Sequence, residues 1–397
     1  KRIKLLSLLT VLGLLIVSGC LFSVGDVTGA RATGERLKKM QASPQWNQDK
    51  ETFDNRLERI DGSWLEMTSK FFFGGSTDRE PGNRSQIEMG NPPDFAVPPE
   101  SGLRITWMGH SSFLVELDGT RTLVDPIWSE RASPFTWAGP KRFFAPPMTL
   151  AQLPALDAVI ISHDHYDHLD RDTVVSLAES NVQWLVPMGV GAHLEHWGVA
   201  PQFIIELDWW ESRKIGSITI TATPSRHFSG RALTMQDQNA TLWAGWAWKG
   251  PKHSVFYSGD TALHHQFGEI GQKLGPFDVT LMEVGAYNQL WADVHLGPEQ
   301  AVLAHQLVQG RIMIPVHWGL FDLALHGWTE PAERVAVAAK YMGVELEILR
   351  PGASFDISQS ANIDKWWPDL PWQSVSEDPA WSSHVEKLQK PFRESPP

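Results

Sequence analysis

Apolar and polar positions follow two recurring patterns over residues 104–349, and together they predict a domain that mixes strands and helices. Short apolar or alternating runs predict strands at residues 104–107, 112–117, 122–125, 158–161, 182–186, 215–223, 241–257, 279–284, 312–316 and 345–349. Helical spacing predicts helices at residues 170–179, 190–197, 263–274, 298–308 and 330–341. Dipeptides Asp118-Gly119 and Gly250-Pro251 predict hairpin turns.

The start of the chain has a different pattern, with Lys1, Arg2 and Lys4 followed by an uncharged, mostly apolar run at residues 5–17. This run is short for a membrane-spanning helix, which needs about 20 residues, and it matches the hydrophobic region of a secretory signal. Cys20 ends the sequence VSGC, which resembles the lipobox of bacterial lipoproteins. The resemblance implies cleavage before Cys20, acylation of its thiol and new amino group, and an outer-membrane location facing the periplasm. The alternative is a buried or membrane-anchored segment with an incidental cysteine.

These patterns divide the chain into four predicted parts. Residues 1–19 are the signal peptide, and residues 20–98 are a lipidated tether with a lead-in segment, of which residues 25–50 have the polar character of a spacer. Residues 99–355 hold the regular structure, and residues 356–397 form a tail rich in Trp and Pro.

Charge and cysteine content narrow the function. The 397-residue chain has 34 Lys plus Arg against 46 Asp plus Glu, a formal charge of −12, which argues against nucleic acid as a partner. A single cysteine excludes an intrachain disulfide and an iron–sulfur cluster. No protein partner is evident. The 19 tryptophans leave open a membrane-facing patch, since the indole ring favours membrane interfaces but also fills cores.

A dense cluster of metal-binding residue types follows the apolar strand at residues 158–161. Residues 162–168 read SHDHYDH, an H-x-H-x-D-H pattern. In an extended loop His163 and His165 point to the same side, and a turn toward the next helix lets Asp167 and His168 face a second point. Imidazole and carboxylate suit Zn²⁺, so the pattern predicts a metal site, with a solvated polar turn as the alternative.

This motif resembles that of the metallo-β-lactamase superfamily, which implies an α/β, four-layer αββα sandwich with two metals at one edge of the sheets. Three further residues match the superfamily's downstream ligands at strand ends, namely His227, Asp260 and His317. The resemblance implies one Zn²⁺ on His163, His165 and His227, a second on Asp167, His168 and His317, and Asp260 bridging both. Another divalent metal is possible.

Further motifs resemble the N-acyl-phosphatidylethanolamine-hydrolysing phospholipase D branch. They are residues 107–116 (WMGHSSFLVE), 123–126 (LVDP), 267–271 (FGEIG), 275–278 (GPFD), 285–287 (GAY), 294–301 (VHLGPEQA), 317–319 (HWG) and 330–331 (EP). The resemblance implies a binuclear zinc phosphodiesterase in which metal-bound hydroxide attacks phosphorus in a membrane lipid. A lactone or ester hydrolase with the same metals is the alternative enzyme, and a catalytically silent envelope-binding lipoprotein is the alternative from another class.

Roles can be assigned to residues beyond the metal set. By resemblance we expect Asp167, Asp260 and His295 to be catalytic, with a structural role as the alternative for His295. Four more side chains are expected to line the substrate site, and they are His110, His265, Tyr287 and His326.

Overall fold

The computed structural model describes residues 26–60 and 62–397. Cys20 and the expected signal peptide at residues 1–19 lie outside this part of the chain. Among the described residues, no helix combines the length and apolar character needed to cross a bilayer.

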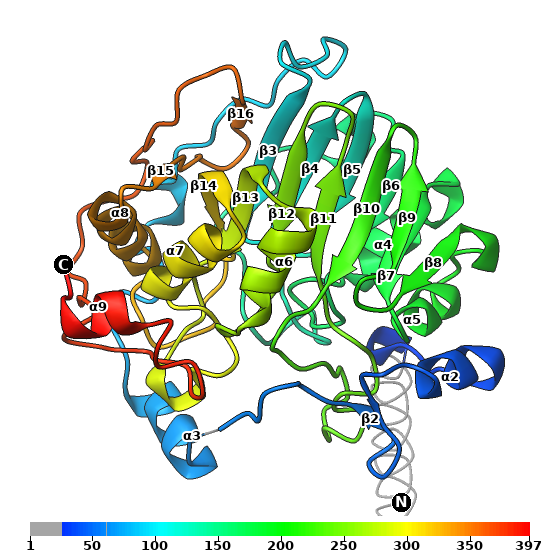
Figure 1. Cartoon of the computed structure of the whole chain (residues 1–397), viewed down its shortest axis with the longest axis horizontal. Helices are drawn as coiled ribbons and strands as arrows, with labels where there is room; N and C mark the ends of the chain where they lie inside the picture. The colour runs from blue at the N-terminus through cyan, green and yellow to red at the C-terminus, as the bar shows by residue number, and fades with distance from the viewer. Residues whose placement is uncertain (1–25, 61) are drawn as a thin grey trace, which may run out of the picture.

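Two seven-stranded sheets face each other at the centre of the molecule, in the orders β16-β3-β4-β5-β6-β7-β8 and β15-β14-β13-β12-β11-β10-β9 (Figure 1). The first contains β3 (Leu103–Gly109), β4 (Ser112–Leu117), β5 (Thr120–Val124), β6 (Ala158–Ile160), β7 (Gln183–Pro187), β8 (Ile204–Leu207) and β16 (Ser354–Asp356). The second contains β9 (Ser212–Ile215), β10 (Ile218–Thr223), β11 (Gly245–Lys249), β12 (Ser254–Tyr257), β13 (Phe277–Glu283), β14 (Gly310–Val316) and β15 (Glu345–Leu346).

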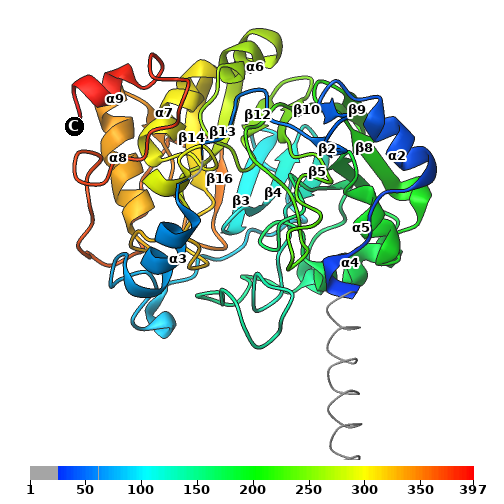
Figure 2. The same cartoon turned by 90° about the horizontal axis from the view of Figure 1, so that it is seen from below.

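Helices cover the outer face of each sheet, which confirms the predicted αββα sandwich (Figures 1 and 2). The first sheet is covered by α4 (Arg171–Leu177) and α5 (Gly191–His196). The second is covered by α6 (Gln266–Leu274), α7 (Pro298–Leu307) and α8 (Glu330–Met342). Short 3₁₀ helices occupy Arg84–Gln86, Leu150–Gln152, Ala178–Ser180, Pro201–Phe203 and Gln289–Trp291.

The apolar sequence of β6 reflects burial on both faces. Ala158 and Ile160 belong to the core between the two sheets, whereas Val159 and Ile161 belong to a second core under α4 and α5. Successive side chains of a strand point to opposite faces, so a strand covered on both sides has no polar face. The sandwich therefore has one apolar layer between the sheets and another beneath the helices.

Two predicted β segments have different bounds in the structure, and one strand was not predicted. The run at residues 215–223 is split by a turn at Gly216, because β9 ends at Ile215 and pairs antiparallel with β10. The stretch at 241–257 is the expected hairpin about Gly250-Pro251, but its first strand begins at Gly245. Strand β8 was not predicted, since its four residues lack a buried alternating face.

Part of the predicted spacer at residues 25–50 is folded and docked on the domain, which corrects that prediction. This region forms α2 (Gly34–Gln41) and β1 (Trp46–Asn47), and the lead-in continues with β2 (Thr52–Phe53) and α3 (Trp64–Phe73). Met40 and Phe53 are buried and belong to the larger hydrophobic core, and Arg36 Nε donates to Glu206 Oε2 at 2.7 Å. Widely spaced apolar residues in a polar segment give no periodic signal, although each fills a specific gap.

The C-terminal tail also contributes to the core. Strand β16 pairs with β3 and extends one residue beyond the expected domain end at 355. Trp366 and Trp367 are buried, and the Trp366 ring lies 5.3 Å from that of Trp318. The tail ends in α9 (Lys390–Glu394).

The docked lead-in predicts a stability effect. Phe53→Ala should lower the free energy of unfolding by about 3–5 kcal/mol, because it removes a fully buried aromatic ring. Leu65→Ala is the control, since Leu65 is 73% exposed and its truncation should change stability by less than about 0.5 kcal/mol. Urea denaturation of both variants tests this, and equal effects would show that the lead-in does not pack on the core.

Candidate metal centre

The residues of the candidate centre meet because the strands that carry them run in one direction. In the second sheet β12, β13 and β14 are parallel, and β10 runs the same way because two antiparallel pairings separate it from β12. In the first sheet β3, β5 and β6 are likewise aligned. The carboxyl ends of all these strands therefore reach one edge of the sandwich. The residues at or just beyond those ends are His110, Asp125, His163, His165, His227, Asp260, Glu283 and His317.

The loop after β6 has the alternation that the sequence predicted. His163 Nε2 lies 2.8 Å from His165 Nδ1, so the two imidazoles point to the same side. Asp164 points away and accepts from Gly230 N and Thr241 Oγ1, both at 2.8 Å. This buried carboxylate ties the loop to the chain segment that follows His227.

Asp170 lies at the end of this loop and is the N-cap residue of α4. Its side chain accepts from Asp172 N at 3.2 Å and from Ser129 N at 2.9 Å. An aspartate at this position satisfies helix N–H groups that have no partner within the helix. The cap fixes the turn that brings Asp167 and His168 to the centre.

Two groups of side chains converge, and they correspond to the two predicted metal positions. In the first group His165 Nδ1 lies 2.8 Å from His163 Nε2 and 3.2 Å from His227 Nε2. In the second group Asp167 Oδ2 lies 3.4 Å from His168 Nε2 and 3.3 Å from His317 Nε2.

Asp260 Oδ2 lies between these two groups. Its distance is 3.1 Å to both His168 Nε2 and His317 Nε2, and 3.8 Å to both His163 Nε2 and His227 Nε2. Gly259 makes this approach possible, because it has φ +59° and a Cβ there would lie 2.6 Å from Ala244 O. A single carboxylate thus faces both groups.

Asp125 holds His168 in place from behind. Its Oδ2 accepts from His168 Nδ1 at 2.8 Å, from Ser162 Oγ at 2.6 Å and from Tyr257 OH at 2.7 Å. Because Nδ1 donates to this carboxylate, His168 presents Nε2 to the centre. Such partners orient metal-binding histidines and raise their basicity. The sequence showed Asp125 only as part of the motif at residues 123–126, and it did not predict that this carboxylate orients His168.

Glu283 is a buried acid beside the centre that no sequence motif singled out. It is fully buried at the end of β13, accepts from Thr261 N at 2.7 Å, and makes a short contact with His295 Nδ1. Its Oε1 also lies 3.6 Å from His317 Nδ1. The sequence did contain one indication, a single acid at the end of an apolar strand. A carboxyl group buried there is costly unless other polar groups hydrogen-bond to it.

The lead-in segment supports His227 directly. Asn55 Nδ2 donates to His227 O at 2.6 Å, and Asn55 Oδ1 accepts from His227 N at 3.1 Å. The ring is fixed separately, since His227 Nδ1 donates to Val294 O at 2.9 Å. These contacts aim His227 Nε2 at the first group and could not be seen from local sequence.

Burial and charge divide the histidines by protonation. Burial lowers the pKa of His163 and His227 well below the ordinary value. Burial also acts against a charged His317, but the acidic groups of Asp260, Asp167 and Glu283 together outweigh it and raise the pKa to about 10. For Asp260, burial is outweighed by His168 and His317, which hold its pKa well below the ordinary value. Asp167 and Asp260 are therefore held in their ionised form, the form in which a carboxylate can bind a cation.

The donor set fits divalent metal ions. Among the described residues, His168 Nε2 and Asp260 Oδ1 are buried without a hydrogen-bond partner. Uncharged imidazole nitrogens in the first group face each other at 2.8–3.2 Å, an arrangement that a shared cation would stabilise. Imidazole nitrogens and carboxylate oxygens gathered in this way are the ligands that Zn²⁺ and related ions prefer.

Of the expected substrate-lining residues, His110 and His326 lie beside the centre. His110 Nε2 is 2.9 Å from Asp167 Oδ2, and its ring lies 4.1 Å from that of His317. His110, His317 and His326 line one small pocket. His326 Nε2 accepts from Ala286 N at 3.0 Å.

The other two occupy different surroundings. Tyr287 is fully buried and its hydroxyl donates to Glu330 Oε1 at 2.6 Å, so it supports the pocket wall by stacking on His326. His265 is exposed and its Nε2 donates to His384 O at 3.2 Å, a contact with the C-terminal tail. Neither ring belongs to the groups that converge on the metal positions.

The fold and the histidine–aspartate cluster define a metal-dependent hydrolase. The sequence model of the beta-lactamase superfamily domain matches residues 120–318, and the chain belongs to this superfamily. An isothiocyanate hydrolase from Delia radicum gut bacteria has a similar fold, with a TM-score of 0.52 and 20% identity over 65% of this chain and 99% of that chain.

Three relatives match different shares of the chain. An uncharacterized protein of Mycobacterium tuberculosis is 49% identical over 67% of this chain and 72% of its own. The N-acyl-phosphatidylethanolamine-hydrolyzing phospholipase D 1 of Caenorhabditis elegans is 39% identical over 59% of this chain and 69% of its own. Outer membrane protein RomA of Klebsiella pneumoniae is 37% identical over 29% of this chain and 91% of its own.

The role of Asp125 can be tested by metal binding. Asp125→Asn should weaken metal affinity by about 10- to 100-fold, because the neutral amide no longer fixes His168 through Nδ1. Asp118→Asn is a matched control, since Asp118 Oδ1 lies the same 2.8 Å from His253 Nδ1 at the opposite end of β5. Competition with a chelator measures both affinities, and equal values for the two variants would exclude this role of Asp125.

Proposed function

We propose that this chain is a binuclear zinc phosphodiesterase that acts on N-acyl-phosphatidylethanolamine-like lipids. The observation that carries the two-metal part is the position of Asp260 Oδ2, which faces both ligand groups at 3.1 and 3.8 Å. On this proposal His163, His165 and His227 hold one ion, Asp260 serves both ions, and the second group holds the other. The remaining ligands of that second group are Asp167, His168 and His317.

Two divalent ions at these positions would activate water and stabilise charge that develops on the substrate. The chain's own residues then orient the reacting groups. Asp260 keeps the two ligand groups together through one carboxylate, and Asp167 links the second group to His110 at 2.9 Å. Because both carboxylates touch the reacting region, we assign them catalytic roles.

His295 is proposed as the residue that contacts the substrate. Its ring stacks on His317 at 5.3 Å and stands edge-on to His227 at 5.1 Å, at the junction of the two groups. Glu283 engages Nδ1, which leaves Nε2 for the substrate or for proton transfer. Burial lowers the pKa of His295 to about 4, although Asp260 acts in the opposite direction.

The relative from Caenorhabditis elegans supports the lipid substrate, because its name states this activity and it is 39% identical over 59% of this chain. A lactone or ester hydrolase with the same metals is the second candidate, since the ligand set does not distinguish phosphorus from carbonyl carbon. A catalytically silent binding protein fits less well. It would have no need of a buried carboxylate network aimed at a metal centre.

We also propose that the protein is held in the bacterial envelope by an acylated Cys20. The lipobox-like sequence VSGC supports this, as does the similarity to a protein named for the outer membrane. Two or three acyl chains would anchor the protein stably, where one chain binds only weakly. A lipid substrate in the same bilayer would reach a high effective concentration near the site.

Metal stoichiometry tests the bridging arrangement. Purified protein should contain about two equivalents of metal, as a two-metal site requires. Asp260→Ala should remove more metal than His165→Ala, because Asp260 faces both groups whereas His165 belongs only to the first. Plasma emission analysis measures both variants, and equal metal loss would rule out the bridging role.

Product analysis tests the reaction. N-acylated phosphatidylethanolamine should yield phosphatidic acid and an N-acylethanolamine, and His295→Ala should lower turnover by about 100-fold with the metals retained. His253→Ala is the control, because its partner Asp118 lies at the far end of the sandwich. If fully metallated protein cleaves lactones but no phosphodiester, the second candidate replaces the first.

A further inference from the structure

The first described residues of the chain lie between two loops that expose apolar side chains. One loop carries Phe135 and Trp137, whose rings lie 5.3 Å apart, and Trp137 is 77% exposed. The other carries Leu233 and Met235, which are 60% and 63% exposed. We call these four side chains the apolar rim.

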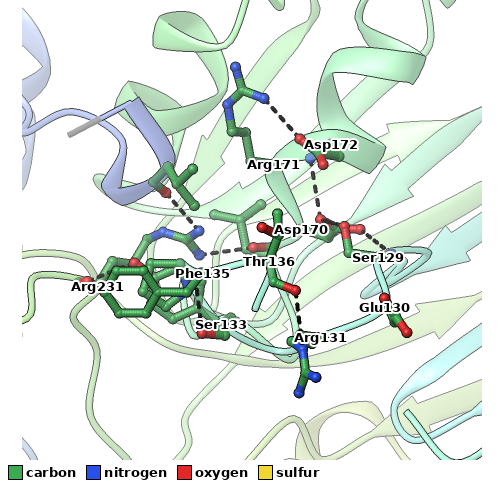
Figure 3. A pocket seen from close by; sticks show the side chains of 14 residues that line it. Ser129, Glu130, Arg131, Ser133, Phe135, Thr136, Asp170, Arg171, Asp172 and Arg231 are labelled. Atoms are coloured by element: carbon green, nitrogen blue, oxygen red, sulfur yellow. Dashed lines mark hydrogen bonds and ion pairs between the residues drawn. The ribbon is translucent and has the colours of Figure 1, made fainter. Parts of the chain in front are cut away.

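Contacts with the start of the chain place the two loops next to each other. Arg231 Nη2 donates to Val27 O at 3.0 Å, and Arg31 donates to Gln236 O in a short contact. Val27 and Phe135 line the same pocket, whose volume is about 220 Å³ and whose side chains appear in Figure 3. In Figure 2 the loop between β5 and β6 and the start of the described chain both project from the lower edge of the molecule.

The same pocket connects the rim with the metal centre. Tyr166 lines it and stands in the sequence between the proposed ligands His165 and Asp167. The Tyr166 hydroxyl donates to Arg231 O at 2.8 Å, immediately before the loop that carries Leu233. The rim is therefore on the side of the molecule from which the metal loop is built.

The composition of the rim is unusual for this chain. Among the tryptophans whose side chains the structure describes, Trp137 is exposed and all the others are buried or half-buried. Tryptophan combines a large apolar ring with a polar N–H and favours the interface between lipid and water. A group of exposed apolar side chains on a protein surface marks a site that a membrane or another protein covers.

We propose that the apolar rim inserts into the surface of a lipid bilayer and turns the metal centre toward it. This inference extends the proposed lipid-hydrolase function, because it names the surface that meets the membrane. It goes beyond anchoring, since an acylated cysteine alone fixes distance but not orientation.

The length of chain before the described part is what favours a bilayer as the occupant. Cys20 precedes Asp26 by six residues, which reach at most about 20 Å when fully extended. An acylated Cys20 would therefore hold the chain start, and the loops on both sides of it, against the membrane surface. A second copy of the chain would have to compete with lipid for this face.

Charge around the rim predicts the kind of lipid. Arg171 pairs with Asp26 and with Asp172, and Lys141 Nζ lies 2.6 Å from Glu130 Oε1. Arg131 and Arg31 donate to backbone carbonyls and add a modest positive charge, but the cations paired with carboxylates add little attraction for anionic headgroups, so binding should rest mainly on apolar burial. We therefore expect insertion into zwitterionic phosphatidylcholine, with weak dependence on salt.

Spin labels can test the proposal in the full, natively processed chain. Cys20 is the chain's single cysteine, so Trp137→Cys, Leu233→Cys and Val97→Cys each add one labelling position. Val97 is a matched control, because it is 58% exposed and its carbonyl accepts from Arg104 at the start of β3, the opposite end from His110. In phosphatidylcholine vesicles, labels at 137 and 233 should collide several-fold more with oxygen, relative to a water-soluble nickel chelate, than the label at 97.

Three outcomes have distinct meanings. Equal nickel access at 137, 233 and 97 would overturn the proposal. Protection of 137 and 233 from both probes in a dimeric protein would assign the rim to contact between copies and would also overturn it. The label count at Cys20, read by mass spectrometry, reports anchoring separately, and neither readout depends on phosphodiesterase activity.

Discussion

The architecture depends on burying acidic side chains among histidines at one edge of an apolar sandwich. Asp125, Asp260 and Glu283 are each at most 3% exposed, and an isolated buried carboxylate would be strongly destabilising. Each is compensated by converging donors, such as the three that meet at Asp125 Oδ2. Asp260 Oδ1 has no hydrogen-bond partner among the described residues, and a bound metal ion would satisfy this oxygen.

This constraint explains why distant segments share one edge. Strands β3, β5, β6, β10, β12, β13 and β14 must end together for the polar network to close, and their aligned directions achieve this. The apolar cores on both faces of the first sheet leave no other place for these charges. Stability and function therefore draw on the same residues, so a change at Asp125 or Glu283 should affect folding as well as metal binding.

The sequence predicted those parts that have a local signal. Strands buried on both faces, helices with regular spacing and the closely spaced motif at residues 162–168 could all be read directly. Glu283, Asn55 and the docked lead-in could not, because their meaning comes from contacts across the chain. Asn55 reaches His227 over 172 positions, and Phe53 fills a gap in a core formed by later strands. Motif proximity likewise does not fix side-chain direction, as the buried Tyr287 and the exposed His265 show.

The position of the lead-in along the chain suggests why residues 34–54 are folded against the domain and do not form a flexible tether. A flexible tether would let the domain tumble, and the metal centre would face the bilayer only part of the time. Docking residues 34–54 on the sandwich fixes the chain start between the loops of the apolar rim, and Asn55 connects the same segment to His227. One continuous piece of chain thus joins the proposed anchor, the proposed membrane surface and a proposed metal ligand. Position relative to the membrane would then be set by packing rather than by linker length.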